Sequence, residues 1–423
     1  MAGLLFISFI VLIFLGVPVA FSLGLSSLLY LFIADIPLSI IPQRMFGGLN
    51  SFTLLCIPGF ILAGNLMNSS GITDRIIHFA NSILGHIRGG LGLANVGASM
   101  GFAGISGTAL ADTASIGSVM IPAMKKQGYG AGFSAAVTAS SSVVGPIIPP
   151  SLPMIMVGTL AALSIGDLFV AGIIPGVLLT LGLMVPTYLI SVKRNYPKGE
   201  RSTLKEIAVS FKDAFWALFM TIIILYGILG GYFTPTEASI IAVIYAIIVG
   251  LFVYKELNVK EIPGIILKSM TSAASIMLLV AFANLFGWIM TREQIPQMIA
   301  DGILSISTNS VIVILLIILL LLFVGTFMET IAALVILFPV LLPVATQIGM
   351  DPIQFGVVMV LTLVLGLMTP PVGVCLFVAS QIANERMGKV VIELIPFFLV
   401  GIVVLLLVAF VPQVTLFLPS LFN

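Results

Sequence analysis

Charged and thiol-bearing residues are both scarce in this chain of 423 residues. Only 8% of the residues are charged, whereas 60% are hydrophobic, and the formal net charge is +1. A chain with so little charge and so much apolar surface does not fold in water, so the lipid bilayer is its expected solvent. The sequence has no basic stripe and no nucleic-acid-binding motif, which excludes nucleic acid as a partner.

Cysteine and histidine are represented by two residues each. Cys56 and Cys375 lie within apolar runs, which indicates small core residues and not a disulfide, a metal site or a nucleophile. His78 and His86 belong to a segment, 72–87, that is predicted to be an amphipathic arm on the cytoplasmic surface. The sequence contains no metal-ligand cluster and no cofactor fingerprint, so we do not expect an enzyme.

Seven apolar runs are long enough to cross about 30 Å of hydrocarbon as helices. They cover residues 4–33, 50–70, 168–192, 213–233, 237–254, 268–290 and 390–418. The first run is too long for the core of a signal peptide and is predicted to be a membrane span. The predicted fold class is therefore an all-α polytopic membrane protein.

Two further apolar segments, 92–124 and 309–345, are interrupted near their middle by small and hydroxyl-bearing residues. These residues are Gly104, Ser106, Gly107, Thr108, Gly325 and Thr326. Each half-segment is too short to cross the bilayer. Non-helical backbone at membrane depth is tolerated only inside the protein or beside a cavity. Both segments are therefore predicted to be re-entrant helical hairpins.

Each hairpin is followed by an apolar span, 129–163 or 352–384, with helix-breaking residues at its centre. The breakers are Gly145, Pro146, Pro149, Pro150, Gly366, Pro370 and Pro371. Proline removes a backbone donor and glycine permits unusual backbone angles, so both spans are predicted to be discontinuous helices.

A constant offset of 221 residues superimposes the breakers of the two halves. It places Gly104 on Gly325, Gly145 on Gly366, and the first Pro-Pro pair on the second. With the N-terminus in the cytoplasm, 15 of the 17 basic residues fall inside, and only Arg44 and Arg292 fall outside. The hairpins then point in opposite directions. Inverted repeats with paired broken helices are typical of secondary transporters.

The expected organisation has five parts. They are scaffold helices and the arm at 1–90, a first transport-domain half at 91–165, connecting and scaffold helices at 166–308, a second transport-domain half at 309–385, and a C-terminal helix at 386–423.

Helix ends at the midplane present unpaired carbonyls and amides, which can hold a cation and an anionic group. We expect two sodium sites, one in each half, where a hairpin tip meets a broken helix. The candidate ligands are Gly104, Ser106, Gly107, Thr108, Gly145, Ile148 and Ser151 in the first half, and Gly325, Thr326, Gly366, Met368 and Thr369 in the second. The alternative is that these small residues serve only close helix packing.

Asp112 and Glu329 are acidic residues within the hairpins, and intramembrane carboxylates are functional candidates. Together with Pro149, Pro150, Pro370 and Pro371, they are the candidates for substrate binding or coupling. No lysine or arginine is predicted at the midplane, so a carboxylate substrate would be met by helix N-termini, hydroxyls and sodium. The same two acids could also form the catalytic pair of an intramembrane enzyme.

Five motifs resemble those of one family, the large permease subunits of tripartite ATP-independent periplasmic (TRAP) transporters, also called DctM-like. The motifs are GVPVAFSLG from Gly16 to Gly24, GISGTALADTASIG from Gly104 to Gly117, GPIIPPS from Gly145 to Ser151, GGYFTPTEA from Gly230 to Ala238, and GLMTPPVG from Gly366 to Gly373. The resemblance covers essentially the whole chain and is nearest to members that carry sialic acid.

The resemblance implies a multi-pass protein of the bacterial inner membrane that imports an organic acid with sodium by an elevator motion. Sialic acid and C4-dicarboxylates are the implied substrates. The implied partners are a periplasmic substrate-binding protein and a small four-helix, DctQ-like membrane subunit. Two other functions fit the residues: a free-standing sodium/dicarboxylate symporter that needs no binding protein, and an ion channel.

Overall fold

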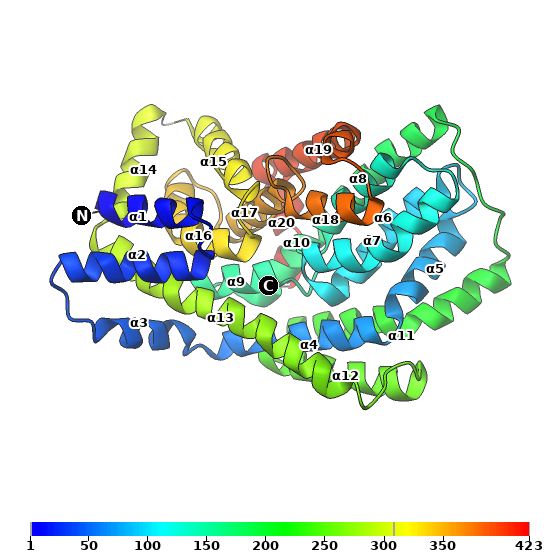
Figure 1. Ribbon diagram of the computed structural model, residues 1–423, viewed down its shortest axis with the longest axis horizontal. Coiled ribbons are helices and arrows are strands. Elements are labelled where there is room, and N and C mark those ends of the chain that lie inside the picture. The colour runs from blue at the N-terminus through cyan, green and yellow to red at the C-terminus, as the bar shows by residue number, and fades with distance from the viewer. Residues whose placement is uncertain (1, 308, 423) are drawn as a thin grey trace.

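The computed structural model describes residues 2–307 and 309–422, and their regular elements are helices (Figure 1). Seven helices in these ranges are long and apolar enough to cross a membrane. They are η1 with α4 (Phe52–Ser69), α10 (Ile165–Lys193), α11 (Leu204–Leu229), α12 with the π-turn η3 (Pro235–Val253), α13 (Ile262–Arg292), α16 (Thr330–Gln347) and α19 (Met387–Phe410). The chain is an all-helical, multi-pass membrane protein.

The remaining helices are shorter. They are α1 (Ala2–Phe14), α2 (Val19–Ile33), α3 (Ile40–Leu49), α5 (Ile72–Leu84), α6 (Gly90–Ser106), α7 (Ala109–Lys126), α8 (Ala131–Ser141), η2 (Ser142–Val144), α9 (Leu152–Ala161), α14 (Ile295–Ile306), α15 (Ser310–Gly325), α17 (Pro352–Gly366), α18 (Val374–Ala383), α20 (Gln413–Leu416) and α21 (Pro419–Phe422).

The prediction of a single span over 4–33 is wrong. This run forms two helices, α1 and α2, of 13 and 15 residues, which pack against each other. The chain turns between them at Gly16, whose φ is +81°, and at Pro18, which precedes α2. At 1.5 Å per residue each helix is only about 20 Å long, shorter than the hydrocarbon layer. Similarly, the run 390–418 is one helix only as far as Phe410, because Pro412 interrupts it.

The predicted interruptions within the apolar segments coincide with helix ends. Only residues 107–108 separate α6 from α7, and residues 326–329 separate α15 from α16. The bounds of α7, 109 and 126, become those of α16, 330 and 347, when 221 is added. The spans 129–163 and 352–384 are each two helices, separated at 145–151 and 367–373. Both cysteines are buried and free, as predicted.

Two elements were not foreseen. Helix α3 lies between the apolar runs 4–33 and 50–70, outside the predicted spans. Helix α14 follows α13 and packs against α16, while α5, the predicted arm, packs against α6 and α11. Adding 221 to the bounds of α5, 72 and 84, gives 293 and 305, so α14 occupies the position of a second arm.

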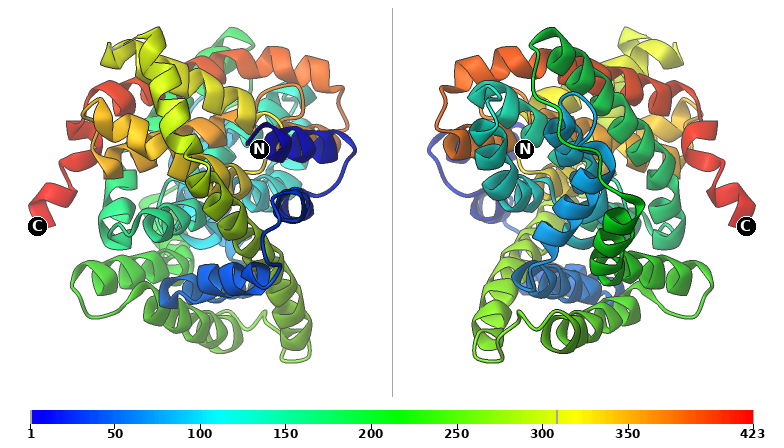
Figure 2. Two further views of the ribbon diagram at one scale, coloured as in Figure 1. Left: turned by 90° about the vertical axis from the view of Figure 1, so that its left-hand side faces the viewer. Right: turned by 90° about the vertical axis from the view of Figure 1, so that its right-hand side faces the viewer.

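Helices α3, α4, α12 and α13 lie along one side of the molecule, while α6–α9 and α15–α18 occupy its middle and opposite side (Figures 1 and 2). Helix α4 packs along α12, and α13 crosses α2, α3 and α4. The broken segments of the two halves interlock, because α9 packs on α16, and α18 packs on α7 and α8. They form one body with a shared core.

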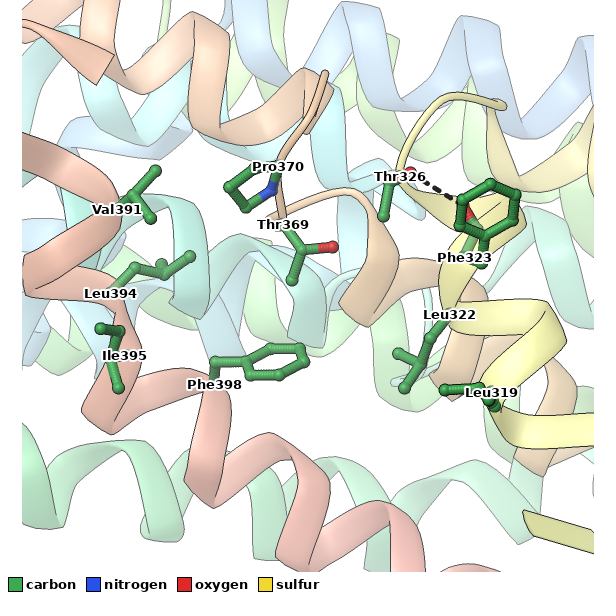
Figure 3. A pocket seen from close by; sticks show the side chains of 10 residues that line it. All are labelled: Leu319, Leu322, Phe323, Thr326, Thr369, Pro370, Val391, Leu394, Ile395 and Phe398. Carbon is green, nitrogen blue, oxygen red and sulfur yellow. Dashed lines mark hydrogen bonds between the residues drawn. The ribbon is translucent and has the colours of Figure 1, made fainter. Parts of the chain in front are cut away.

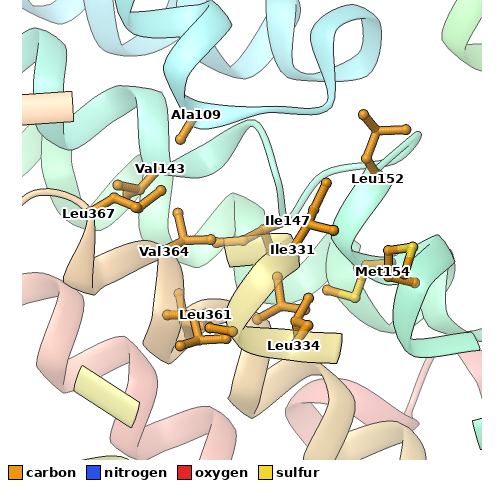
Figure 4. Packing of buried hydrophobic residues seen from close by; sticks show 14 of the residues in the cluster. Ala109, Val143, Ile147, Leu152, Met154, Ile331, Leu334, Leu361, Val364 and Leu367 are labelled. Atoms are coloured by element: carbon orange, nitrogen blue, oxygen red, sulfur yellow. The ribbon is translucent and has the colours of Figure 1, made fainter. Parts of the chain in front are cut away.

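This shared core is drawn from both halves (Figure 4). Val143, Ile147, Leu334, Leu361 and Val364 are all fully buried in it. Lipid tails are as apolar as these side chains, so van der Waals contact within the packed core stabilises the fold, more than transfer of apolar surface out of water.

The contact between α4 and α12 generates a first prediction. A Cβ on Gly59 of α4 would lie 2.7 Å from Ser239 Cβ of α12, which is closer than carbon atoms approach. We expect Gly59→Ala to destabilise the protein by about 1–3 kcal/mol, the usual cost of overpacking. The control is Gly287→Ala in α13, where a Cβ would meet nothing within 4 Å. Thermal midpoints of the purified variants measure the effect; equal midpoints would contradict this packing.

Candidate functional site

The tip between α6 and α7 lies against the loop that interrupts the first broken helix. Gly107 has a φ of +62°, and a Cβ there would lie 2.8 Å from the carbonyl oxygen of Pro150. Thr108 caps α7 by accepting a hydrogen bond from Ala111 N (3.4 Å), and Ser151 caps α9 by accepting one from Met154 N (3.2 Å). The tip and the loop, which were predicted to form the first sodium site, are therefore in contact. We call the candidate ligands of this site the first cluster and those of the second site the second cluster.

Asp112 lies at the centre of this first cluster. Its side chain is fully buried, and its Oδ1 accepts a hydrogen bond from the Ser106 hydroxyl. Its Oδ2 faces Gly145 so closely that a Cβ there would collide with it. Among the described residues, Oδ2 has no hydrogen-bond partner. A buried carboxylate oxygen without a partner is costly, and a bound cation or a proton would satisfy it.

The second cluster is built from close backbone contact. A Cβ on Gly325 would lie 2.7 Å from the Leu363 carbonyl oxygen and 3.1 Å from Gly366 Cα. The Gly373 amide donates to the Thr326 carbonyl oxygen (3.0 Å), which ties the loop after α17 to the end of α15. The hydroxyl of Thr369 donates to the Gly366 carbonyl oxygen (2.8 Å). These bonds place the predicted second-half residues side by side.

An apolar cavity of about 370 Å³ opens beside the second cluster (Figure 3). Thr326 reaches it from the end of α15, and its hydroxyl donates to the Phe323 carbonyl oxygen (2.8 Å). Thr369 and Pro370 reach it from the loop after α17, and α19 closes the far side. Met368, in the same loop, is fully buried.

Glu329 differs from Asp112 in both exposure and partners. It is an exposed residue at the N-terminus of α16. Its Oε2 accepts hydrogen bonds from Ile331 N (2.9 Å) and Ala332 N (3.3 Å). A carboxylate at a helix N-terminus is stabilised by these amides and by the helix dipole. The two acids therefore occupy different environments. The 221-residue offset also separates them, because it places Thr108 on Glu329 and Asp112 on Ala333.

One of the predicted ligands points elsewhere. The Gly104 carbonyl accepts a hydrogen bond from Thr221 Oγ1 of α11 (3.0 Å), so this oxygen is directed at α11 and not at Asp112. The side chain of Ile148 packs at Gly176 of α10, and this residue stays a predicted ligand through its backbone carbonyl. Among the prolines, Pro150 lies at Gly107, and Pro370 lines the apolar cavity. The Pro149–Pro150 and Pro370–Pro371 bonds are both cis.

A second cavity, of about 200 Å³, joins the first cluster to α4 and α13. Polar side chains from both sides line it: Asn65, Asn68, Ser106, Thr108, Ser115, Lys268 and Ser272. From the sequence, Lys268 was predicted to lie in the cytoplasm, and the α4 and α13 side of the cavity was not predicted. The spacing of polar residues in the sequence could have indicated this side of the cavity. Asn65 and Asn68 lie on one face of α4, and Lys268 and Ser272 lie on one face of α13.

The oxygens of both clusters suit a hard cation better than a transition metal. No group of three His, Cys, Asp or Glu residues that could hold a metal ion is found within 2–307 and 309–422. The clusters instead offer carbonyl and hydroxyl oxygens and, in the first, one carboxylate.

Comparison with known proteins places nearly the whole chain in one family. The family model described as the DctM component of tripartite ATP-independent periplasmic transporters matches residues 6–414. The chain belongs to the DctM family. It is a TRAP transporter large permease protein, and not an enzyme.

Relatives of this permease differ in the acid they are named for. It is 43% identical to the sialic acid TRAP transporter large permease protein SiaM of Vibrio cholerae, over 97% of this chain and 96% of that protein. It is 39% identical to the C4-dicarboxylate permease DctM of Pseudomonas aeruginosa, over 94% of each. It is 42% identical to the isethionate permease DctMQ of Oleidesulfovibrio alaskensis, over 98% of this chain and 65% of that protein.

Two solved transporters share the fold. The Alcanivorax borkumensis YdaH transporter superimposes with a TM-score of 0.62 at 16% identity, over 90% of this chain and 88% of that one. Neisseria gonorrhoeae MtrF gives a TM-score of 0.52 at 14% identity, over 90% and 85%. At these identities the likeness concerns the fold alone.

The contact at Gly107 generates a second prediction. Gly107→Ala combines a left-handed backbone angle, which costs about 1 kcal/mol for alanine, with a clash against Pro150. Gly128→Ala is the matched control, because Gly128 has a φ of +88° and open space around its Cβ position. We expect Gly107→Ala to lower the initial uptake rate at least about tenfold, a barrier change of roughly 1.4 kcal/mol. Gly128→Ala should retain most uptake, and equal losses would refute a specific role for the tip.

Proposed function

We propose that this permease imports an organic acid together with sodium ions across the bacterial inner membrane. Sialic acid is the first substrate to test, because of the similarity to SiaM, and a C4-dicarboxylate is the second. One observation carries the proposal: the cavity lined by Ser106 and Thr108, next to buried Asp112, also reaches Lys268 on α13. Such a cavity offers oxygens to a cation and an ammonium group to an acid.

In this proposal each cluster holds one sodium ion as cargo. The first ion lies among Ser106, Thr108 and the free oxygen of Asp112, against the Gly145–Ser151 loop. The second lies among carbonyl and hydroxyl oxygens of Thr326, Gly366 and Thr369. Helix ends supply carbonyl oxygens with negative dipole, and sodium in turn favours an anionic substrate nearby. Binding of the acid would then depend on sodium.

The proposed motion is an elevator in which segments 91–165 and 309–385 move as one transport domain. Their interlocked packing supports movement as a unit, and α4, α12 and α13 on one side are suited to be the stationary scaffold. The two helix pairs, α6–α7 and α15–α16, are re-entrant hairpins of opposite direction in this mechanism. The N-terminus and the base of α6–α7, with Lys125 and Lys126, face the cytoplasm.

Two partners complete the proposed transporter. A DctQ-like membrane subunit with four helices is supported by the DctMQ relative, of which this chain covers 65%. Exposed apolar side chains on the scaffold side, including Phe32, Phe46 and Phe252, face either lipid or that subunit. A periplasmic binding protein delivers the substrate. Reconstitution with and without each component tests both partners: uptake by this chain alone would favour a free-standing symporter, and single-channel conductance would favour an ion channel.

The sodium sites generate a third prediction. Ser106→Ala and Thr369→Ala each remove one proposed oxygen ligand, so the sodium concentration for half-maximal uptake should rise. A rise of about fivefold corresponds to roughly 1 kcal/mol for one lost ligand. Ser118→Ala on α7, where the exposed hydroxyl bonds only to the Ser115 carbonyl, is the control. Sodium-independent uptake by the parent protein would sink the coupling proposal.

Lys268 generates a fourth prediction. Among the described residues that line the cavity, it is the one that carries a charge. Lys268→Gln should weaken binding of the acid to the purified membrane subunits by roughly threefold, since an exposed ion pair contributes up to about 1 kcal/mol. Lys260→Gln, at an exposed position before α13, should leave binding unchanged. Calorimetric titration without the binding protein measures both, and equal affinities for the two variants would exclude Lys268 from the site.

A further inference from the structure

Helices α6 and α8 meet through buried polar pairs. Asn95 Nδ2 donates to Thr138 Oγ1 (2.7 Å), and one turn further along α6, Ser99 Oγ donates to Ser141 Oγ (2.8 Å). All four side chains are fully buried. We call these four residues, together with Ser142, the polar seam.

The polar seam extends to Asp112 from the base of α6–α7, the end of the helix pair where α6 begins and α7 ends. At the base, Asn95 lies 3.7 Å from the sulfur of Met124, the residue before Lys125. At the other end, Ser142 donates its hydroxyl to the Thr138 carbonyl (2.7 Å), and its own carbonyl accepts from Gly145 N (3.2 Å). Gly145 in turn touches Asp112 Oδ2. Polar groups therefore follow one another along the helix contact.

Each end of this run carries an orphaned polar atom. Within the part of the chain that the structure describes, Asn95 Oδ1 and Asp112 Oδ2 are buried and have no hydrogen-bond partner. Helix packing alone does not need such atoms, because a buried acceptor without a donor is destabilising. Water or a cation that enters the seam would satisfy both.

In the second half, the described residues form no side-chain hydrogen bond between α15 and α17. Helix α15 packs on α17, and its buried residues include Val313, Ile317 and Leu321. Adding 221 to Thr138, Ser141 and Ser142 gives Met359, Thr362 and Leu363 on α17, all fully buried. Thr362 is the polar member of the three, but its hydroxyl donates to the Val358 carbonyl of its own helix (2.6 Å) and not across to α15. Exposing apolar side chains to water is unfavourable, whereas amides and hydroxyls exchange their protein partners for water at little net loss. Of the two contacts, the α6–α8 contact is the easier to open to water.

We propose that the polar seam is the route by which water reaches Asp112, and by which sodium leaves the first cluster, when α6 separates from α8. The route leads to the face of the membrane at the base of α6–α7, and the α15–α17 contact stays dry. This inference rests on the proposed function for the identity of the cation and for the assignment of that face to the cytoplasm.

The test is the accessibility of single introduced cysteines in the full chain, co-expressed with its small subunit. Asn95→Cys and Ser99→Cys report on the seam, and Ile317→Cys and Leu321→Cys are controls at the same spacing on α15. The parent chain gives the background, since Cys56 and Cys375 are both fully buried. A membrane-impermeant thiol reagent is applied to vesicles of each orientation.

We expect the seam cysteines to react from the α6–α7 base side about tenfold faster than the controls, a difference of roughly 1.4 kcal/mol in opening free energy. Sodium should slow this reaction. Adding Asn95→Leu to the Ser99→Cys chain should protect the thiol, because the seam becomes apolar.

Equal reaction of seam and control cysteines, or none at the seam, would show that the polar pairs only hold the helices together. Faster reaction after Asn95→Leu would also overturn the proposal. The readout is chemical labelling and not uptake, so it stands apart from a failure of sodium coupling or of substrate assignment.

Discussion

Backbone groups at a helix end must find partners inside the protein wherever lipid replaces water, and both clusters depend on this requirement. In the first half, Thr108 and Ser151 cap α7 and α9, and the tip and the loop lie in contact. In the second, the Gly373 amide bonds to the Thr326 carbonyl, and Glu329 caps α16. Side chains and loops that satisfy broken helices are thereby gathered at the same two places.

The broken helix ends approach each other closely, and glycine permits this approach because it has no Cβ. The Gly325–Gly366 contact leaves no room for a Cβ, and neither does Gly145 beside Asp112. Oxygen atoms are consequently concentrated where the backbone is least covered by side chains. The same geometry that solves the hydrogen-bonding problem therefore gathers the oxygens that the proposed cation sites require.

The sequence was informative where backbone chemistry is local. Glycine, proline and hydroxyl residues located the interruptions, and the offset of 221 residues related α7 to α16 at both ends. It was less informative where an apolar run was long. The run 4–33 is long enough for one membrane span, so the turn at Gly16 and Pro18 was not predicted. The direction of a backbone carbonyl was beyond it, because Gly104 lies in the last turn of α6 with its oxygen toward Thr221 of α11. The cavity with Asn65 and Lys268 arises only when α4 and α13 pack beside the tip.

Similar backbones carry different side chains in the two halves, and this difference has consequences for transport. The first cluster contains a buried carboxylate, borders a polar cavity and joins the polar seam, whereas the second borders an apolar cavity. In the proposed function, a cation in the second cluster would be held by neutral oxygens alone, so its departure would leave no charged side chain behind. A cation in the first cluster would neutralise Asp112, and its departure would expose a charge that only water or a proton can compensate. The first cluster is therefore the one that needs a hydrated route.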